Sequence, residues 1–317
     1  MRHPRRLRLL RAALVVCGVA AGLLVGEGAA RSVHTSLELE NFNLAGGGNA
    51  TGCVQPSVTR GYEPIPGSCG VNADGARVYE QAGRGPPVRV MVVGDSITTQ
   101  TTWPASLTQG LATRWDRAVE LHTYGVPGYN TCQELTMYLE KVQGVAPDVV
   151  LLQACMNDAR GSPVLTRDGG MVRVHRQGEV TTFPAIFLWS RLLTLAMSTL
   201  APTSAGVSEA EAARGCLAHL RDDVDARGVP LFTTLFPLFY ARDVAPPDQM
   251  ADEDVMRTLL RASGAAFLDL RPVYEAAGPM ADHRDSPADS IHPSAAGQRE
   301  AAWALAEWMG ARPPSVR

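Results

Sequence analysis

Val90-Met-Val-Val-Gly-Asp-Ser96 decides the fold, because an apolar run that stops at a serine is typical of a buried strand followed by a tight turn. Similar short runs recur along the chain, and each is continuous in hydrophobicity rather than alternating. Continuous runs favour parallel strands that are buried on both faces of a sheet. The predicted strands are Val88–Val93, Val119–Tyr124, Val149–Gln153, Pro230–Phe236 and Ala266–Leu270.

Helical patterns separate these strands, and they cover residues 103–114, 131–142, 208–227, 251–263 and 294–309. Alternating strands and helices require right-handed crossovers, which cover both faces of the sheet with helices. We therefore predict a three-layer α/β/α sandwich with a five-stranded parallel sheet over residues 87–312. In such a sheet the ligand site lies beyond the carboxyl ends of the strands.

The composition is that of a globular protein with one sizeable core, since 45% of the 317 residues are hydrophobic and 19% are charged. The net charge of −3 gives no reason to expect a polyanionic partner, and basic residues cluster only at the N-terminus. Nucleic-acid binding is therefore not expected. Residues 31–86 are rich in Gly, Asn, Pro and Ser, which predicts an irregular N-terminal extension.

The first 30 residues have the pattern of a secretory signal. Met1 to Arg11 contains five arginines, and residues 12–26 are almost wholly apolar and are followed by small residues. The apolar stretch is shorter than the roughly 20 residues that a membrane span needs. We expect export to a secreted or extracytoplasmic location, with an uncleaved membrane anchor as the alternative.

Export would allow disulfides to form. Cys53 and Cys69 bracket a weakly apolar stretch, where a disulfide would add stability, while two small buried residues are the alternative. Cys17 lies in the signal, so an odd number of cysteines remains, and Cys216 in a helical pattern suits a buried free thiol. No Cys-x-x-Cys or His-x-x-x-His spacing indicates zinc, and we expect no metal or cofactor.

Residues 159–206 form a long insertion between a strand and a helix. Met171–Thr182 alternates about a turn at Arg176-Gln-Gly, as a β-hairpin does, and Phe183–Leu200 is strongly apolar. The apolar part is either a cap over the site or an additional core helix.

Ser96 and Asp289-Ser-Ile-His292 carry the predicted chemistry. A serine hydroxyl becomes nucleophilic when a base removes its proton, and a histidine held by a carboxylate is the usual base. Ser96 follows the first strand, where Gly94 eases the sharp turn that exposes the hydroxyl. Both residues also have a structural explanation: Ser96 could cap a helix in a strand-to-helix loop, and Asp289 could cap the last helix.

Hydrogen-bond donors follow the next two strands. Gly128 comes after the second strand and would present a backbone N–H, and Asn157 comes after the third and would present its amide. Together with the N–H of Ser96 they would form an oxyanion hole at one edge of the sheet.

These four blocks, in this order, resemble the SGNH (GDSL-type) hydrolase superfamily: Gly94-Asp-Ser-Ile-Thr98, Gly125-Val-Pro-Gly128, Asn157-Asp158 and Asp289-Ser-Ile-His-Pro293. The resemblance covers residues 87–310 and implies the flavodoxin-like fold of that superfamily. It implies Ser96 as nucleophile, His292 as base, Asp289 as its orienter, and Ser96, Gly128 and Asn157 as oxyanion donors. The third block usually reads Gly-x-Asn-Asp, whereas Cys155 occupies the glycine position here.

The expected function is an exported serine ester hydrolase acting on an acylated carbohydrate, a lipid or a small molecule. Acyl transfer to a sugar hydroxyl would use the same residues and is the closest alternative, and a non-catalytic envelope-binding protein is the third. No Gly-x-Ser-x-Gly elbow occurs, which disfavours an α/β-hydrolase fold.

The remaining histidines have plainer interpretations. His283, with Asp282 and Asp285, is a rival base or a metal cluster, but an exposed loop fits it better. His122 lies in a strand pattern and is expected to be a core residue with a hydrogen-bond partner.

Overall fold

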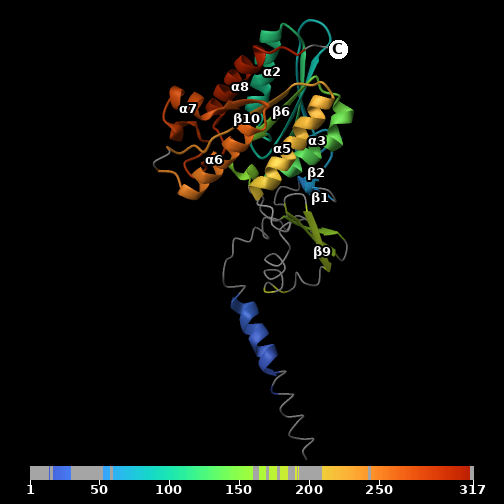
Figure 1. Ribbon diagram of the computed structural model, residues 1–317, viewed down its shortest axis with the longest axis vertical. Coiled ribbons are helices and arrows are strands. Elements are labelled where there is room, and N and C mark those ends of the chain that lie inside the picture. The colour runs from blue at the N-terminus through green and yellow to red at the C-terminus, as the bar shows by residue number, and fades with distance from the viewer. Residues whose placement is uncertain are drawn as a thin grey trace, which may run out of the picture.

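Figure 1 shows the computed structural model of the chain, with labels on part of its helices and strands. It describes residues 14, 17–29, 53–57, 60–159, 164–168, 171–176, 179–184, 190, 192, 209–241 and 244–314.

A six-stranded sheet forms the centre of the fold, in the order β11-β10-β6-β4-β5-β3. The strands are β3 Arg77–Gln81, β4 Val88–Gly94, β5 Val119–Gly125, β6 Val149–Ala154, β10 Leu231–Leu235 and β11 Ala266–Asp269. All but β3 run parallel, and these five are the five predicted strands. When the five parallel strands are numbered 1 to 5 along the chain, their order across the sheet from β5 to β11 is 2-1-3-4-5. This is the doubly wound order of flavodoxin-like sheets. The order reverses between β4 and β6, where such sheets bind ligands.

Two predictions are wrong because of the edge strand β3. The sheet has six strands rather than five, and the N-terminal extension is not wholly irregular. The strand β3 lies within residues 31–86 and pairs antiparallel with β5. Exposure alternates along most of the strand, because Arg77 and Tyr79 are partly buried while Val78 and Glu80 are exposed, as in a half-exposed edge strand. The strand contains no continuous apolar run, which is why the sequence pattern did not indicate it.

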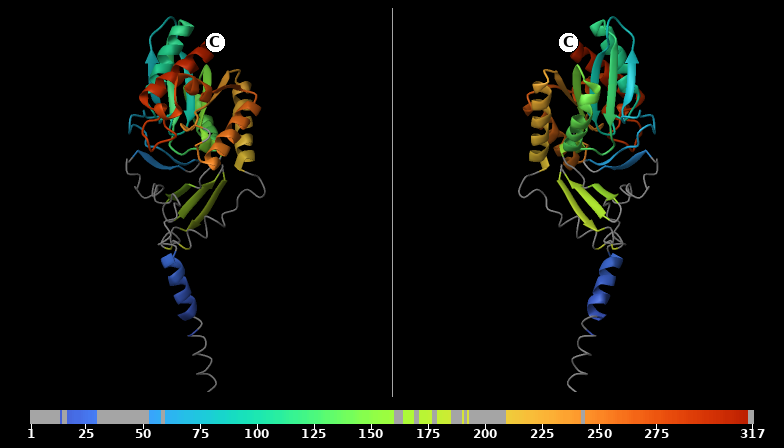
Figure 2. Two further views of the ribbon diagram at one scale, coloured as in Figure 1. Left: turned by 90° about the vertical axis from the view of Figure 1, so that its left-hand side faces the viewer. Right: turned by 90° about the vertical axis from the view of Figure 1, so that its right-hand side faces the viewer.

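Helices cover both faces of the sheet, as predicted, and Figures 1 and 2 show the resulting layers. On one face lie α2 Thr102–Trp115, α7 Arg271–Ala277 and α8 Ala295–Gly310, and on the other α3 Thr131–Val145, α5 Glu209–Ala226 and α6 Pro247–Ala262. Alternate residues of β4 point into the two layers. Val90 and Val92 contribute to one core cluster, Met91 and Val93 contribute to the other, and all four are fully buried.

The described part of the extension before β3 is held together internally by a hairpin and a disulfide. β1 Val54–Ser57 and β2 Gly61–Pro64 form an antiparallel hairpin. Cys53 and Cys69 form the disulfide that the sequence left as one of two possibilities.

A second disulfide joins Cys132 to Cys216, so the expectation of a free thiol at Cys216 is wrong. Cys132 lies in the first turn of α3 and Cys216 lies in α5, and the two helices pack side by side on one face of the sheet. The buried free thiol is Cys155 instead.

We expect the Cys132–Cys216 disulfide to contribute more stability than Cys53–Cys69. The two bonds join residues 84 and 16 positions apart, and closing the longer loop removes more entropy from the unfolded chain. The double substitution Cys132→Ser/Cys216→Ser should lower the free energy of unfolding by about 4.5 kcal/mol, against about 3 kcal/mol for Cys53→Ser/Cys69→Ser. Urea unfolding of both variants measures this, and an equal or reversed order would contradict it.

The insertion contains a separate antiparallel sheet of β7 Val164–Asp168, β8 Met171–Arg176 and β9 Glu179–Pro184. The predicted hairpin is therefore confirmed, with β7 added to it. The apolar segment from 185 to 200 lies outside the described residues, apart from Ser190 and Leu192.

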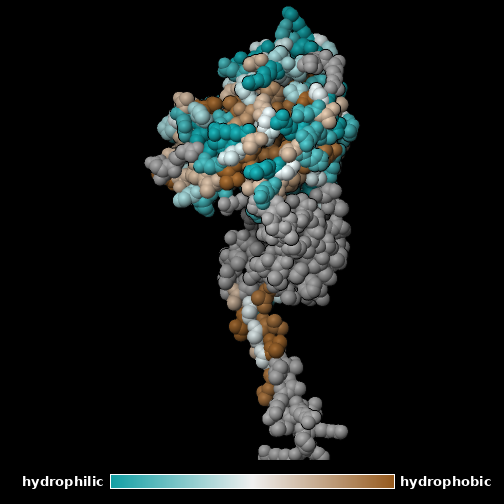
Figure 3. Space-filling model, viewed as in Figure 1, coloured by the Kyte–Doolittle hydropathy of each residue, from teal (hydrophilic) through white to brown (hydrophobic). Residues whose placement is uncertain are grey.

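Residues 17–29 are helical, and their leucine and valine side chains are exposed, as the brown surface in Figure 3 shows. Within the described ranges, no helix has both the length and the apolar character to span a bilayer.

Candidate active site

Ser96 lies in the turn that follows β4, at the point where the strand order reverses. Gly94 ends the strand, and a Cβ there would lie 2.3 Å from Thr98 Oγ1 and 2.5 Å from Gln153 Oε1, so only glycine fits. The buried Asp95 closes the turn by accepting the Ile97 N–H at 2.9 Å. Close packing at Gly94 and the hydrogen bond of Asp95 thus fix the turn, and the partly exposed Ser96 faces the site.

His292 reaches Ser96 from the segment before α8. Its Nε2 lies 2.7 Å from Ser96 Oγ, and its Nδ1 lies 2.7 Å from Asp289 Oδ2. Folding therefore brings Ser96 together with a histidine that lies 196 positions further along the chain and with its neighbour Asp289. In this arrangement the imidazole can accept the hydroxyl proton while the carboxylate holds the other ring nitrogen.

Asp289 is held in its charged form by local hydrogen bonds. Burial opposes the charge, but the backbone N–H groups of His292 and Ile291 donate to Oδ1 at 3.0 and 2.9 Å, and the imidazole adds to them. The balance lowers the pKa of Asp289 below its usual value. A carboxylate that stays ionised can orient the imidazole and stabilise its protonated form.

A buried ion pair anchors the segment that carries Asp289 and His292. Arg271 and Glu253 are both buried and joined at 2.7 Å, and Arg271 also donates to the Leu238 carbonyl at 3.0 Å. The hydrogen bond from Arg271 fixes the loop after β10. In that loop the Phe239 N–H donates to the carbonyl of Ser290, which lies between Asp289 and His292, at 2.7 Å.

Gly128 lies beside the nucleophile turn. The loop after β5 is joined to β4 where the Val126 N–H donates to the Gly94 carbonyl at 3.2 Å. Gly128 has φ +77°, which favours glycine, and a Cβ there would lie 3.1 Å from the hydroxyl of Tyr62. The loop is exposed at this residue, so its backbone is accessible to a substrate.

Asn157 lies in the short helix η2 Met156–Ala159, directly after β6. The carbonyl oxygen of its amide faces Cys155 Sγ at 2.6 Å, and the residue is partly exposed. Ser96, Gly128 and Asn157 therefore follow three adjacent strands at one sheet edge, as predicted.

The comparisons with known proteins agree with this geometry. The family model for GDSL-like lipases and acylhydrolases matches residues 92–300, which includes all of these residues. The chain belongs to the GDSL-like lipase/acylhydrolase family. Its members hydrolyse esters, so the protein is an ester-hydrolysing enzyme.

The solved structures to which the chain is similar are distant from it in sequence. A lipase/acylhydrolase from Enterococcus faecalis is 15% identical, with a TM-score of 0.47, over 72% of this chain and 99% of that one. An acetylxylan esterase from Geobacillus stearothermophilus is 15% identical, with a TM-score of 0.45, over 74% and 98%. No curated protein matches the sequence significantly.

Several residues that shape the site of this GDSL-like hydrolase were not found from the sequence. Tyr62 comes from the extension, and its hydroxyl donates to the carbonyl of Pro127, next to Gly128. Gln153, in a strand that reads as apolar, is fully buried and accepts the Thr98 hydroxyl at 2.6 Å. A glutamine inside a buried strand was the available signal, because a buried amide needs a partner.

The rival histidine is part of the core. His283 is buried and its Nδ1 lies 2.7 Å from Glu300 Oε2, so the expected exposed loop is wrong at this residue. His122 is partly buried in β5 and pairs with Glu120 at 2.6 Å, which agrees with a histidine that has a partner.

One group of side chains in the described part of the chain has the spacing of metal ligands. Asp95, Cys155 and Asp158 are buried, and their ligand atoms lie within 4.8 Å of one another. These atoms already bond to one another and to neighbours: the Cys155 N–H donates to Asp158 Oδ2 at 2.7 Å, and Sγ contacts Asp95 Oδ2 at 2.9 Å. Their arrangement is that of a hydrogen-bond network beneath Asn157.

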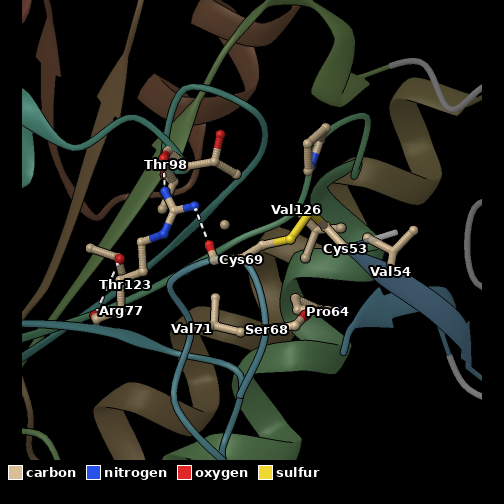
Figure 4. A pocket seen from close by; sticks show the side chains of 13 residues that line it. Cys53, Val54, Pro64, Ser68, Cys69, Val71, Arg77, Thr98, Thr123 and Val126 are labelled. Atoms are coloured by element: carbon tan, nitrogen blue, oxygen red, sulfur yellow. Dashed lines mark hydrogen bonds between the residues drawn. A yellow bond between two sulfur atoms is a disulfide. The ribbon is translucent and has the colours of Figure 1, made fainter. Parts of the chain in front are cut away.

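A cavity of about 200 Å³ lies where the hydrolase domain meets the extension (Figure 4). Its walls are the Thr98–Thr99 turn, the loop Gly125–Pro127, and the Cys53–Cys69 disulfide with nearby valines. Arg77 crosses it, donating to the carbonyl of Thr99 and, at 3.0 Å, to that of Cys69. The two loops that line it also carry Ser96 and Gly128.

Proposed function

We propose that the protein hydrolyses esters through a covalent acyl-enzyme on Ser96. The observation that carries this is the continuous chain of hydrogen bonds from Ser96 Oγ through His292 to Asp289, with 2.7 Å at each step. Membership of the family supports the reaction class.

In the first half of the reaction, His292 Nε2 takes the proton of Ser96 as Oγ attacks the ester carbonyl. The backbone N–H groups of Ser96 and Gly128 and the amide of Asn157 donate to the oxyanion. The tetrahedral intermediate then collapses, and His292 returns the proton to the departing alcohol oxygen.

In the second half, His292 takes a proton from water, and the hydroxide attacks the acyl carbonyl. The Ser96 ester bond breaks, Oγ recovers its proton from His292, and the free acid leaves. Acyl transfer would replace the water with a sugar hydroxyl and leave every other step unchanged.

Product analysis tests both forms of the proposal. The purified protein is incubated with aryl esters from acetyl to long-chain and with an acetylated glycan, in the presence of a polysaccharide acceptor. Hydrolysis should release the free acid. An acyl group recovered on the acceptor would replace hydrolysis by transfer, and no turnover of any ester would contradict the proposal.

The cavity beside the site is the place where we expect the acyl chain to lie. His292 must protonate the leaving oxygen, so the alcohol part faces His292 and the acyl part faces away from it. The cavity walls come from the loops after β4 and β5 and from the extension, with none from the His292 segment.

Val71→Trp should therefore change the chain-length preference, because Val71 lines the cavity. Activity on longer acyl chains should fall by about tenfold in kcat/KM relative to acetyl esters, as for a few methylenes excluded from an apolar pocket. Val244→Trp is the matched control, because Val244 is 67% exposed and does not line the cavity. An unchanged ratio in Val71→Trp would place the acyl chain elsewhere.

We also propose that residues 1–30 direct export of the enzyme. The basic and apolar pattern of the segment supports this, and so do the two disulfides, which form in oxidising compartments. N-terminal sequencing of the protein from an expressing bacterium tests it. A mature terminus near residue 30 is expected for cleavage, an intact Met1 in the membrane fraction would favour an anchor, and an intact Met1 in the cytoplasm would contradict export.

A further inference from the structure

The thiol of Cys155 lies directly beneath the amide of Asn157. Cys155 lies between β6 and η2, is 1% exposed, and forms no disulfide. Its Sγ contacts two oxygens, Asn157 Oδ1 at 2.6 Å and Asp95 Oδ2 at 2.9 Å. The sulfur therefore bridges the nucleophile turn, which contains Asp95, and the helix that carries Asn157.

A thiol has a single proton, so it can donate to only one of these two oxygens at a time. Asp95 is fully buried, and burial raises the pKa of its carboxyl group despite the hydrogen bonds from Cys155 and Ile97. When Asp95 carries a proton it can donate to Sγ, which leaves the thiol proton for Asn157 Oδ1. Burial also raises the pKa of Cys155 well above its usual value, so the sulfur keeps its proton as a donor.

The direction of this contact fixes the direction of the amide. An amide has an acceptor oxygen at one end and a donor nitrogen at the other. Because Oδ1 faces the buried sulfur, Nδ2 points away from it. An oxyanion hole needs the donor end of the amide, in place before the charge develops.

We propose that Cys155 is a positioning residue, whose thiol holds Asn157 so that its amide nitrogen is presented to the oxyanion. This rests on the proposed role of Asn157 in ester hydrolysis. Glycine, the usual residue at this position in the superfamily that the chain resembles, has no side chain for this contact. The backbone of the turn is held separately, by the Cys155 N–H to Asp158 Oδ2 at 2.7 Å, so the thiol is free to act on the side chain of Asn157.

Cys155→Ala and Cys155→Ser form the matched pair that tests this. Alanine removes the donor, and kcat for a short-chain aryl ester should fall by about tenfold, the effect of one lost hydrogen bond, with KM within about twofold of wild type. Serine keeps an O–H donor and should restore kcat to within about threefold. Thermal unfolding of both variants checks that they are folded, and Cys155→Val, which also lacks a donor, replaces Cys155→Ala if that variant does not fold.

A double-mutant cycle separates positioning from a general structural effect. Asn157→Ala alone should lower kcat by about 10²–10³, the effect of removing one oxyanion donor. If Cys155 acts through Asn157, adding Cys155→Ala to Asn157→Ala should cause no further loss beyond about twofold.

Each other outcome has a definite meaning. An unchanged kcat in Cys155→Ala, or the same tenfold loss in the Asn157→Ala background, would overturn the positioning role while leaving ester hydrolysis intact. A wild-type protein with no turnover and no reactive Ser96 would instead overturn the proposed function.

Discussion

Replacing Ser96 with alanine is expected to lower the kcat of ester hydrolysis by at least about 10⁴-fold. The Ser96 hydroxyl lies 2.7 Å from His292 Nε2, and without it no acyl-enzyme can form. Residual turnover would come from the oxyanion donors and from binding alone. Initial rates on a short-chain aryl ester, measured on folded protein, provide the comparison.

Ser286→Ala is the matched control for this substitution. Ser286 is an exposed serine in the loop before Asp289, so it changes the same functional group outside the hydrogen-bond chain. Its kcat should equal that of wild type. A Ser96→Ala enzyme with more than about a tenth of the wild-type kcat would contradict the assignment of the nucleophile.

Asp289→Asn is expected to lower kcat by about 10⁴-fold with little change in KM. Asparagine keeps an oxygen that can accept the N–H groups of Ile291 and His292, so the turn should remain in place. It removes the charge that faces His292 Nδ1 at 2.7 Å, and the imidazole is then no longer held in the form that accepts the Ser96 proton.

The exposed neighbour Asp285 serves as the control for charge alone. Asp285→Asn should retain wild-type kcat, because the side chain of Asp285 takes no part in the hydrogen-bond chain that ends at Ser96. If the two variants lost activity equally, the effect would be one of net charge on the loop, and the specific role of Asp289 would be refuted.

The sequence was sufficient to predict the parallel part of the sheet and the longer helices that cover it, but not the short helix α7. Runs such as Val149–Gln153 are apolar because both of their faces are buried, and this property is local. The site residues were also predictable, since Ser96, Gly128 and Asn157 each follow a strand and therefore meet at one edge. The edge strand β3 was missed because half-exposed strands lack that signal.

Features that depend on tertiary packing were not predictable from local patterns. The Cys132–Cys216 disulfide exists because α3 and α5 lie on the same face of the sheet, and nothing in the residues around Cys216 indicates this. His283 reads as exposed because acidic residues flank it, yet it is buried, and α8 supplies Glu300 as its partner. The contact of Cys155 with Asp95 likewise joins the ends of two neighbouring strands, 60 positions apart.

Two buried polar side chains hold the loops that carry the candidate active site. Gln153 fixes the turn below Ser96 through Thr98, and Arg271 fixes the loop that holds the Ser290 carbonyl. Neither side chain touches the hydrogen-bond chain from Ser96 to Asp289. Each side chain is buried and therefore needs a hydrogen-bond partner, and in each case that partner lies in a loop or turn of the site.

The most direct measurement is covalent labelling of the wild-type protein with a fluorophosphonate, followed by peptide mass spectrometry. A serine activated by His292 should take one label, on Ser96, and the label should be lost in His292→Ala while that variant stays folded. A folded wild-type protein that stays unlabelled, or that carries its label on another residue, would contradict the account.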